Sequence, residues 1–437
     1  MSGSSSIAVI GAGYVGLVNA ACLADLGHSV ACFDIDSEKV DKLSNGIVDI
    51  LEPGLTELVA KNQDAGRLSF HGNAETALGS ADIVFLCVDT PTDPVTGPNL
   101  RNLMGGIDSV LDHGHSVSTL VMRSTVPPGT TAVVSQSIAA RNGHQPMNIV
   151  VHPEFFQEGQ AVADCQAPSR IVVGSDDQPT AQRVAELWQS SATPQMITDT
   201  ATAEMIKQAS NAFLAAKISF INEMARICDA TGADIDLVAK GMGLDPRIGR
   251  RYLQAGIGFG GSCLPKDLRA LISSAHALGW SPPALEAALK VNDDQILVIA
   301  EKLYQRIDGL EGKKVAILGL TFKPDTADFR DSPAMALAHH LSAEGVDVRA
   351  TDPAMDQAPR GATNEFELFV DPAECVRGAD AVVLATAWPI YRDLSWPEVA
   401  DAMSGNLVVD GRNVLNVSEI KAAGLRYVGA GRGSVSD

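Results

Sequence analysis

Residues 258–267, with the sequence GFGGSCLPKD, contain the side chain best suited to covalent chemistry, Cys263. Cys263 follows a glycine-rich loop and directly precedes a predicted helix, since Pro265 fits a first helical turn. A cysteine at a helix N-terminus beside Lys266 should favour its thiolate and act as a nucleophile. A lone cysteine is more often a small core residue, but the glycines make room for a ligand. We therefore interpret Cys263 as a nucleophile and keep the buried core residue as the alternative.

A second pattern indicates a dinucleotide site. Residues 7–17 read IAVIGAGYVGL, and Gly11, Gly13 and Gly16 match G-x-G-x-x-G between a predicted strand and a predicted helix. Such glycines allow a tight turn and bring the backbone close to a pyrophosphate at the helix N-terminus. Asp34 follows about 20 residues later, where a carboxylate binds ribose hydroxyls. The arrangement favours NAD over NADP, with Lys39 as a further phosphate contact; a glycine turn without a ligand is the alternative.

Polar residues on a long apolar helix form a third candidate. Glu204, Lys207 and Asn211 are spaced three and four apart, so they share one helix face. Such a stripe is either a solvated face or the wall of a site. These residues alone favour the solvated face.

Two carboxylates and a threonine follow predicted strands. Glu154 and Glu158 lie in HPEFFQEG, and Thr125 lies in RSTVPPGT. The carboxyl ends of parallel strands are where doubly wound sheets bind ligands. Surface charge is the alternative interpretation of both glutamates.

A nicotinamide and a reactive cysteine together suggest a four-electron oxidation. An alcohol would lose a hydride, the resulting aldehyde would add to the thiolate, and a second hydride transfer would leave a thioester for water to hydrolyse. The cysteine would retain the intermediate between the two oxidations.

Alternating strands and helices must position these groups. Short runs rich in Val and Ile resemble strands buried on both faces of a parallel sheet. Residues 200–231 contain neither Pro nor Gly and predict one long helix. The expected fold is α/β, with two Rossmann-like doubly wound domains joined by a long central helix. The expected domains are residues 1–199, 200–308 and 309–437, and the predicted strands are 7–10, 30–34, 82–88, 120–125, 149–151, 171–173, 315–318, 346–350, 381–385, 407–410 and 427–428.

Composition excludes several classes of protein. The 437 residues include 33 Lys and Arg against 53 Asp and Glu, a net charge of −20. So acidic a chain disfavours nucleic acid and membrane surfaces as partners. Seven cysteines without a CxxC motif argue against a disulfide framework. We expect no metal, no signal peptide and a cytoplasmic location.

The motifs together resemble the UDP-glucose/GDP-mannose 6-dehydrogenase family over nearly the whole chain. The matching stretches, in chain order, are IGAGYVGL, EPGL at 52–55, CVDTP at 87–91, RSTVPPGT, HPEFFQEG, Lys207 with the NAFL of 211–214, GFGGSCLPKD, FKPDTADFRDSP and DGR at 410–412.

The resemblance implies roles for the catalytic groups. Cys263 would be the thioester nucleophile, Glu154 the base of the later steps, and Thr125 would position water. The substrate hydroxyl, the oxyanion and a bound water would be handled by Lys207, Asn211 and Asp267.

It also implies two binding sets. The cofactor, NAD, would be bound by Gly11, Gly13, Tyr14, Val15, Gly16, Asp34, Lys39, Thr90, Thr125, Glu158 and Arg330. A UDP-sugar would be bound by Glu154, Phe155, Phe156, Lys207, Asn211, Arg247, Tyr252, Leu253, Gln254, Gly260, Lys323 and Arg412. Arg247 resembles the arginine that reaches a neighbouring subunit's site, which implies a homodimer or a higher homo-oligomer.

Two residues depart from the family pattern, and some questions stay open. His152 replaces the usual Asn and Phe156 the usual Leu, both beside Glu154. The resemblance favours UDP-glucose as the substrate and UDP-glucuronate, a polysaccharide precursor, as the product; GDP-mannose and UDP-N-acetylmannosamine are the alternatives. A two-electron β-hydroxyacid-type dehydrogenase and a non-enzymatic NAD-binding protein are the rival interpretations.

Overall fold

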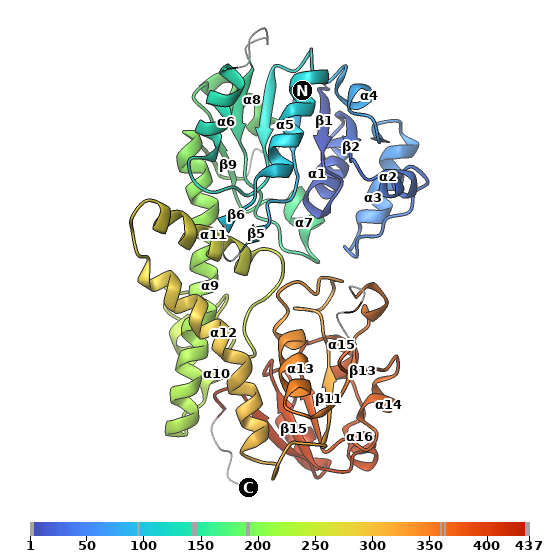
Figure 1. Ribbon diagram of the computed structural model, residues 1–437, viewed down its shortest axis with the longest axis vertical. Coiled ribbons are helices and arrows are strands. Elements are labelled where there is room, and N and C mark those ends of the chain that lie inside the picture. Colours follow the sequence, from blue (N-terminus) through green and yellow to red (C-terminus); the bar gives the residue numbers. More distant parts are fainter. Residues whose placement is uncertain are drawn as a thin grey trace. The chain divides into compact units, whose positions relative to one another are not determined.

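The computed structural model describes residues 4–432 except 94–96, 141–146, 189–192, 359–360 and 362–363. The chain divides into two compact units, each described here by itself. The first comprises residues 1–210 with 269–280, and the second 211–268 with 281–437. Each unit contains one large sheet (Figure 1).

The first sheet has the strand order β10-β9-β8-β7-β4-β1-β2-β3. The chain leaves β1 through β2 to one side and later through β4 to the other. β1 and β4 therefore form the switch point at which doubly wound sheets bind ligands. The strands are β1 (Ser6–Ile10), β2 (Ser29–Phe33), β3 (Leu68–His71), β4 (Ile83–Leu86), β7 (Thr119–Met122), β8 (Asn148–Val151), β9 (Ile171–Gly174) and β10 (Gln195–Thr198).

Both faces of this sheet are buried. In β1, Ile7 and Val9 belong to one apolar cluster, whereas Ala8 and Ile10 belong to another. Alternate side chains point to opposite faces of a strand, so a continuous apolar run is what a doubly covered sheet requires. The helices of this unit are α1 (Tyr14–Asp25), α2 (Ser37–Ser44), α3 (Leu55–Asp64), α4 (Ala74–Leu78), α5 (Arg101–His113), α6 (Thr130–Ala139), α7 (Ala161–Gln166) and α8 (Gln178–Glu186). A short hairpin, β5 (Thr92–Asp93) with β6 (Gly97–Pro98), precedes α5.

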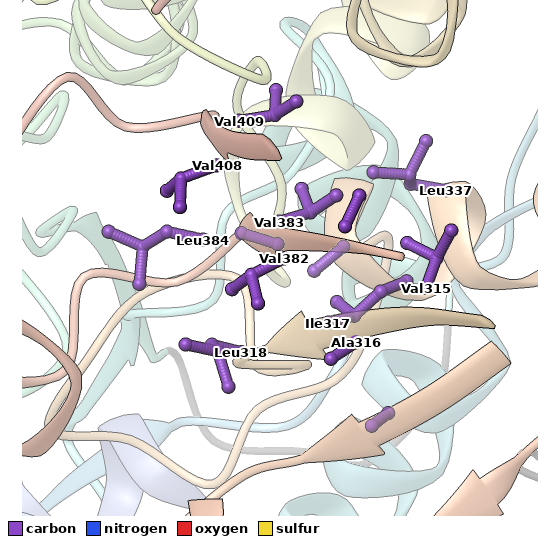
Figure 2. Packing of buried hydrophobic residues seen from close by; sticks show 14 of the residues in the cluster. Val315, Ala316, Ile317, Leu318, Leu337, Val382, Val383, Leu384, Val408 and Val409 are labelled. Carbon is purple, nitrogen blue, oxygen red and sulfur yellow. The ribbon is translucent and has the colours of Figure 1, made fainter. Parts of the chain in front are cut away.

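The second sheet repeats the winding of the first, with the order β13-β12-β11-β14-β15-β16 and parallel pairing throughout. Side chains of its three central strands and Leu337 form one buried cluster (Figure 2). The strands are β11 (Lys314–Leu318), β12 (Asp347–Thr351), β13 (Glu367–Leu368), β14 (Ala381–Leu384), β15 (Leu407–Asp410) and β16 (Arg426–Gly429). The helices of this unit are α10 (Ile235–Gly243), α12 (Pro283–Tyr304), α13 (Pro333–Ala343), the 3₁₀ helix η1 (Met355–Gln357), α14 (Pro372–Val376), α15 (Pro389–Arg392), α16 (Trp396–Ala402) and α17 (Val417–Ala422).

Two helices contribute residues to both units. They are α9 (Thr200–Thr231), with 32 residues, and α11 (Leu264–Ala277). The predicted fold class is confirmed: two doubly wound sheets and a long central helix.

The strand prediction failed in two respects. It missed β3, β10 and β13 because these edge strands are only partly buried and lack a continuous apolar run. It also treated the sheet as wholly parallel, whereas β9 joins β8 antiparallel, with Val151 opposite Gly174. An antiparallel neighbour needs no long crossover connection, and the segment between β8 and β9 contains the loop at residues 152–160 and the short helix α7. In the described part of the chain, no helix is both long and apolar enough to cross a membrane.

Candidate active site

The glycine loop between β1 and α1 is shaped to accept a pyrophosphate. Gly11 has φ +97°, and a Cβ there would stand 2.7 Å from the Cys87 carbonyl oxygen. A Cβ on Gly16 would overlap the Gly11 carbonyl, so this glycine permits the close approach of helix and strand. A Cβ on Gly13 would meet nothing within 4 Å, and no side chain caps α1 there. The backbone at Gly13 is thus open to an anionic ligand, as the predicted NAD site requires.

Asp34 lies at the end of β2 and closes this loop. Its Oδ2 accepts the Ala12 N–H at 2.7 Å, and its Oδ1 accepts the Asp36 N–H at 3.0 Å. The Lys39 ammonium lies 3.3 Å from Oδ2. A carboxylate has about four acceptor positions, so these contacts leave Asp34 able to accept ribose hydroxyls.

A second loop approaches the first from the carboxyl end of β8. The Gly159 N–H donates to the Tyr14 hydroxyl at 2.9 Å and to Glu52 Oε2 at 2.7 Å, and the Tyr14 hydroxyl also donates to Glu52. Burial and the Glu52 carboxylate raise the pKa of Tyr14, so its hydroxyl stays protonated. Glu158, predicted near the nicotinamide, is therefore anchored beside the glycine loop through its neighbour. The sequence analysis quoted Glu52 only as part of a motif and missed this role.

A buried ion pair lies at the centre of the first unit. Lys207 Nζ donates to Glu154 Oε1 at 2.9 Å, and the Phe156 N–H donates to Oε2 at 2.6 Å. Burial alone would raise the pKa of Glu154, but the Lys207 ammonium, that N–H and the Arg123 guanidinium hold it below its ordinary value. Lys207 thus faces a carboxylate. Because Glu204, Lys207 and Asn211 are all buried, the favoured solvated-face interpretation of the α9 stripe is wrong.

Arg123, which the sequence analysis missed, organises the loop around Glu154. It is almost fully buried and donates to the backbone oxygens of His152 at 3.0 Å and Pro153 at 3.2 Å. Its guanidinium carbon lies 5.2 Å from the Phe156 ring and 5.1 Å from the Trp188 ring. Burial lowers the pKa of Arg123, and the aromatic faces compensate part of that desolvation.

Both departures from the family pattern therefore belong to one cluster. The His152 ring lies 5.6 Å from Trp188, and its Nδ1 is 2.7 Å from the Val172 carbonyl oxygen. Burial, followed by the charge of Arg123, lowers the pKa of His152 well below its ordinary value, so the ring is neutral. Phe156 packs on Arg123 and the core rather than standing alone at a surface.

Phe155 packs against Lys207. Its ring lies 5.5 Å from Lys207 Nζ and 3.7 Å from the Arg170 guanidinium carbon. Two cations on one ring restrict where the ring can lie. The predicted contact of Phe155 with the substrate stays a prediction.

Thr90 and Thr125 are joined at the ends of neighbouring strands. The Thr90 hydroxyl donates to the Thr125 carbonyl at 2.6 Å. Adjacent parallel strands bring their carboxyl ends to the same sheet edge, which explains why residues 35 positions apart meet.

The second unit contains the cysteine. Cys263 directly precedes α11, and its carbonyl accepts the Asp267 N–H at 2.9 Å, the first bond of that helix. The helix N-terminus favours negative charge on the sulfur. Asp267 is buried and accepts the Asn211 amide at 2.6 Å and the Lys266 ammonium at 2.6 Å.

The catalytic set predicted from the resemblance is thus divided between the units. Thr125, Glu154 and Lys207 lie in the first unit, and the remaining three lie in the second. Lys207 and Asn211 are four residues apart on α9 and so lie on the same helix face.

The glycine loop before Cys263 is held by amide side chains, of which Asn222 and Gln295 are buried and Asn292 is half-buried. Asn292 makes two bonds with the backbone of Phe259, at 2.8 and 3.1 Å. Asn222 accepts the Gly256 N–H at 2.8 Å, and the Gln295 amide donates to the Gly256 carbonyl at 2.8 Å. The sequence analysis missed these three residues; isolated amides in apolar helix faces are the signal that would have found them.

Arg412 connects the glycine loop before Cys263 to the second sheet through hydrogen bonds. Its guanidinium donates to the carbonyls of Ala385 at 2.7 Å, Gly258 at 3.1 Å and Phe322 at 2.7 Å. Burial lowers the pKa of Arg412 to about 10. A Cβ on Gly260 would overlap the Asp331 carbonyl, so this glycine lets the loop pack closely.

The other predicted substrate residues have varied surroundings. Leu253 is buried in a small apolar cluster with Ile221 and Ala225, so only its backbone is available to a ligand. Arg247 is exposed and pairs with Asp245 at 2.6 Å. The remaining positions are Tyr252, half-buried with φ 66°; Gln254, exposed; and Lys323, 5.4 Å from the Phe322 ring. Arg330, predicted to bind the cofactor, pairs with Asp328 at 2.7 Å.

Profiles of one family match three consecutive parts of the chain. They describe the NAD-binding, central and UDP-binding domains of the UDP-glucose/GDP-mannose dehydrogenase family and match residues 5–192, 201–294 and 316–417. The chain is 42% identical over 433 residues to a UDP-glucose 6-dehydrogenase of Bacillus subtilis, covering 98% of each chain. It is 39% identical to the Rhizobium meliloti UDP-glucose 6-dehydrogenase, covering 98% of this chain and 99% of the relative.

Solved structures agree with this assignment. A UDP-glucose dehydrogenase from Pyrobaculum islandicum superposes with a TM-score of 0.92 at 36% identity, covering 98% of each chain. A UDP-D-ManNAc dehydrogenase from Pyrococcus horikoshii gives 0.87 at 27%, covering 98% of this chain and 100% of that chain. The chain therefore belongs to the UDP-glucose/GDP-mannose dehydrogenase family and is an NAD-dependent nucleotide-sugar dehydrogenase.

Proposed function

We propose that the protein oxidises C6 of UDP-glucose twice, through a covalent Cys263 intermediate, and releases UDP-glucuronate. The observation that carries the proposal is the exposure of the cysteines. Six of the seven are buried, and Cys263 alone is half-exposed, at the end of a glycine loop and the start of a helix. A core role explains the six, whereas a nucleophile must be accessible.

NAD would be bound by the open backbone at Gly13, by Asp34 and Lys39, and by Thr90. When bound, each NAD would accept one hydride, so the two oxidations would use two NAD molecules in succession. Arg330 and Glu158 stay in the proposed cofactor set on the strength of the family resemblance.

The first unit's residues suit proton transfer and water activation. Glu154 is ionised near neutral pH because its pKa lies below the ordinary value, so it is present as a base. We assign it the base function of the later steps, with Thr125 positioning the water. Lys207 would exchange its contact with Glu154 for the substrate oxygen.

In the second unit, we assign the stabilisation of the developing oxyanion to Asn211. Asp267 accepts from both Asn211 and Lys266, so its carboxyl group orients the Asn211 amide. The thiolate would add to the aldehyde carbon, and after the second oxidation the sulfur would carry the acyl group as a thioester.

UDP-glucose is favoured over other sugar nucleotides by the comparisons. The relatives named for it are 42% and 39% identical, against 27% for the UDP-D-ManNAc enzyme. The proposed substrate residues are those of the sequence analysis, with Arg412 acting also through the loop that it holds.

The test is to supply excess NAD and a limiting, known amount of UDP-glucose and to count NADH per sugar. Two NADH and an acidic product support the proposal. One NADH indicates a two-electron alcohol dehydrogenase. No NADH with UDP-glucose but two with GDP-mannose or UDP-N-acetylmannosamine corrects the substrate, and none with any of them contradicts the proposed reaction.

We also propose a homodimer. Phe213, Phe220 and Ile227 recur every seven residues along α9 and are 67%, 45% and 53% exposed. A heptad stripe of apolar side chains is suited to pairing with the same helix of a second copy. Sedimentation of the wild type as a dimer and of Phe220→Glu as a monomer would support this, and a monomeric wild type would contradict it.

Two further expectations belong to the proposal. The division at residues 199 and 308 gives the central helices to a dimerisation domain. A cytoplasmic location is supported by the seven free thiols.

A further inference from the structure

A carboxylate on α9 holds the loop that follows β7. Glu204 is buried, and its Oε2 accepts the Gly129 N–H at 2.6 Å. Its Oε1 accepts both the N–H of Thr131 at 2.8 Å and its hydroxyl at 2.6 Å. The side chain thereby caps the N-terminus of α6 from a different helix, where a negative charge is favourable.

A second α9 residue holds the same loop closer to Thr125. The buried Gln208 amide donates to the Val126 carbonyl at 3.0 Å. From the other side, the Thr90 hydroxyl binds the Thr125 carbonyl. The backbone of residues 125–131 is therefore fixed at four places by buried or nearly buried groups.

Lys207 lies between these two anchors on α9. It pairs with Glu154 at 2.9 Å, while Glu204 and Gln208 reach the Thr125 loop. Residues three and four apart lie on one helix face, so one helical turn determines where the loop and the ion pair lie relative to each other. All of these residues belong to the first unit.

We propose that Glu204 and Gln208 are positioning residues for thioester hydrolysis, setting Thr125 against the Lys207–Glu154 pair. This inference rests on the proposed function. In that step a water oxygen bonds to the acyl carbon, and its proton passes to Glu154. The carbon–sulfur bond breaks, Cys263 leaves as a thiolate, and no electrons are exchanged with the cofactor.

Displacing the loop should slow this step more than the oxidations. Hydrolysis depends on a water held in line with the acyl carbon, and a displacement of about 1 Å can slow such a step about 100-fold. The oxidations depend on the cofactor and the cysteine, and neither Glu204 nor Gln208 belongs to the proposed cofactor or catalytic sets, so at saturating NAD the oxidations should be slowed less.

The test compares Glu204→Gln and Gln208→Met with the wild type in rapid-quench assays and intact-protein mass spectra. Glu204→Gln keeps the size of the side chain and removes one acceptor. Gln208→Met removes the donor to the Val126 carbonyl. Because Gln208 Oε1 has no partner in the described residues, that carbonyl is the one group that loses this side chain's hydrogen bond. Gln208→Met thus keeps the proposal testable if Glu204→Gln does not fold.

The expected result is a fall in kcat of about 10- to 100-fold, with a burst of NADH and most of the enzyme carrying the acyl group on Cys263. The assays use saturating NAD, because Thr125 also belongs to the proposed cofactor set and its displacement should raise KM for NAD. The control is Asp177→Ala, which removes an acidic cap of another helix, α8, in the same unit. It should lower stability without a burst.

A fall in kcat without accumulation of the acyl-enzyme, or a burst of equal size in Asp177→Ala, would overturn the inference. Failure of the proposed function is distinguishable. The wild type would then release fewer than two NADH per sugar and form no adduct on Cys263 that hydroxylamine can cleave.

Discussion

The two sheets contain the same turn, but only the first leaves it open to a ligand. Gly11 and Gly319 have φ +97° and +95°, and each donates its N–H to the last residue of the neighbouring strand at 2.8 Å. Asp34 and Asp352 both follow that strand, and each accepts a backbone N–H of the turn at 2.7 Å. The doubly wound topology of each sheet is therefore accompanied by a glycine in the first turn and an aspartate after the neighbouring strand.

Asp34 and Asp352 differ in the groups that surround their carboxylates. Asp352 Oδ2 also accepts the N–H and hydroxyl of Thr321, each at 2.9 Å, and the Trp388 indole at 3.2 Å. Asp352 is 2% exposed, whereas Asp34 is 9% exposed and faces Lys39. The second turn is satisfied by protein groups, and α13 begins only at Pro333, so no helix N-terminus is presented at the turn. The same turn is thus open in the first unit, where we propose that it binds the cofactor, and is filled by protein groups in the second.

The largest expected effect is on kcat, and it distinguishes the half-exposed Cys263 from a buried cysteine. Cys263→Ala should lower kcat by about 1,000-fold or more, because the covalent intermediate is lost, and should leave stability nearly unchanged. Cys375→Ala, at a fully buried position of the second sheet's core, should lower the free energy of unfolding by about 1 kcal/mol and keep turnover. Steady-state kinetics and urea unfolding measure both; normal turnover in Cys263→Ala would remove the nucleophile assignment.

Adding one methyl group to each turn is the next test. Gly11→Ala and Gly319→Ala both force a side chain into the left-handed region, at a cost of up to about 3 kcal/mol. Gly11→Ala also presses on the Cys87 carbonyl and should weaken NAD binding. A Cβ at Gly319 overlaps the Thr386 side chain, so that variant should lose stability instead.

Calorimetric titration with NAD and thermal unfolding would separate the two glycine variants. Equal loss of NAD affinity in both, after correction for the unfolded fraction, would show that the comparison is wrong.

Neutralising the two aspartates should have smaller effects of different kinds. Asp34→Asn should raise KM for NAD about 10-fold, the effect of one lost charged hydrogen bond, and change KM for the sugar nucleotide little. Asp352→Asn turns an amide toward donors and should lower the free energy of unfolding by about 2 kcal/mol. If Asp34→Asn affected both Michaelis constants equally, its assignment to the ribose would fail.

The smallest expected effect is that two buried carboxylates, Glu154 and Asp410, contribute to stability with opposite dependence on pH. Lys207 and its neighbours lower the pKa of Glu154 despite burial, so its stabilising contribution is present above the unfolded-state pKa and is lost as pH falls through the folded-state pKa. Burial raises the pKa of Asp410, against the bonds from Leu415 and Arg412. Its contribution is therefore largest below the unfolded-state pKa and declines as pH rises through the folded-state pKa.

Unfolding of the wild type, Glu154→Gln and Asp410→Asn between about pH 3.5 and 7, a window around ordinary carboxyl pKa values, would measure this. The stability difference from the wild type should grow with pH for Glu154→Gln and shrink for Asp410→Asn. Slopes of the same sign would contradict the opposed pKa directions.

Most of the fold could be predicted from the sequence, because the patterns that indicate its strands and helices are local. Doubly buried strands read as continuous apolar runs, and α9 reads as a span without Pro or Gly, so both were predicted. The edge strands β3 and β10 were missed because their partial burial leaves no such run. The antiparallel direction of β9 was also missed, since direction is encoded in no residue of the strand itself.

The reactive residue types and the cofactor turn were determined by the sequence alone. Glycine is favoured where φ is positive and the backbone approaches closely, as at Gly11. A carboxylate is expected at the end of the second strand, and a cysteine before a helix is evident in residues 258–267. The family resemblance added the remaining roles, which composition and spacing left open.

Only the tertiary structure decided which polar side chains meet. Glu204, Lys207 and Gln208 look alike as polar residues of a helix, yet one caps α6, one pairs with Glu154 and one holds Val126. Likewise, Asp34 and Asp352 occupy the same place in the winding and differ only in the neighbours supplied by distant strands. Hydrogen bonds and ion pairs act over about 3 Å, so their partners are set by packing between segments far apart in the chain, which no local pattern records.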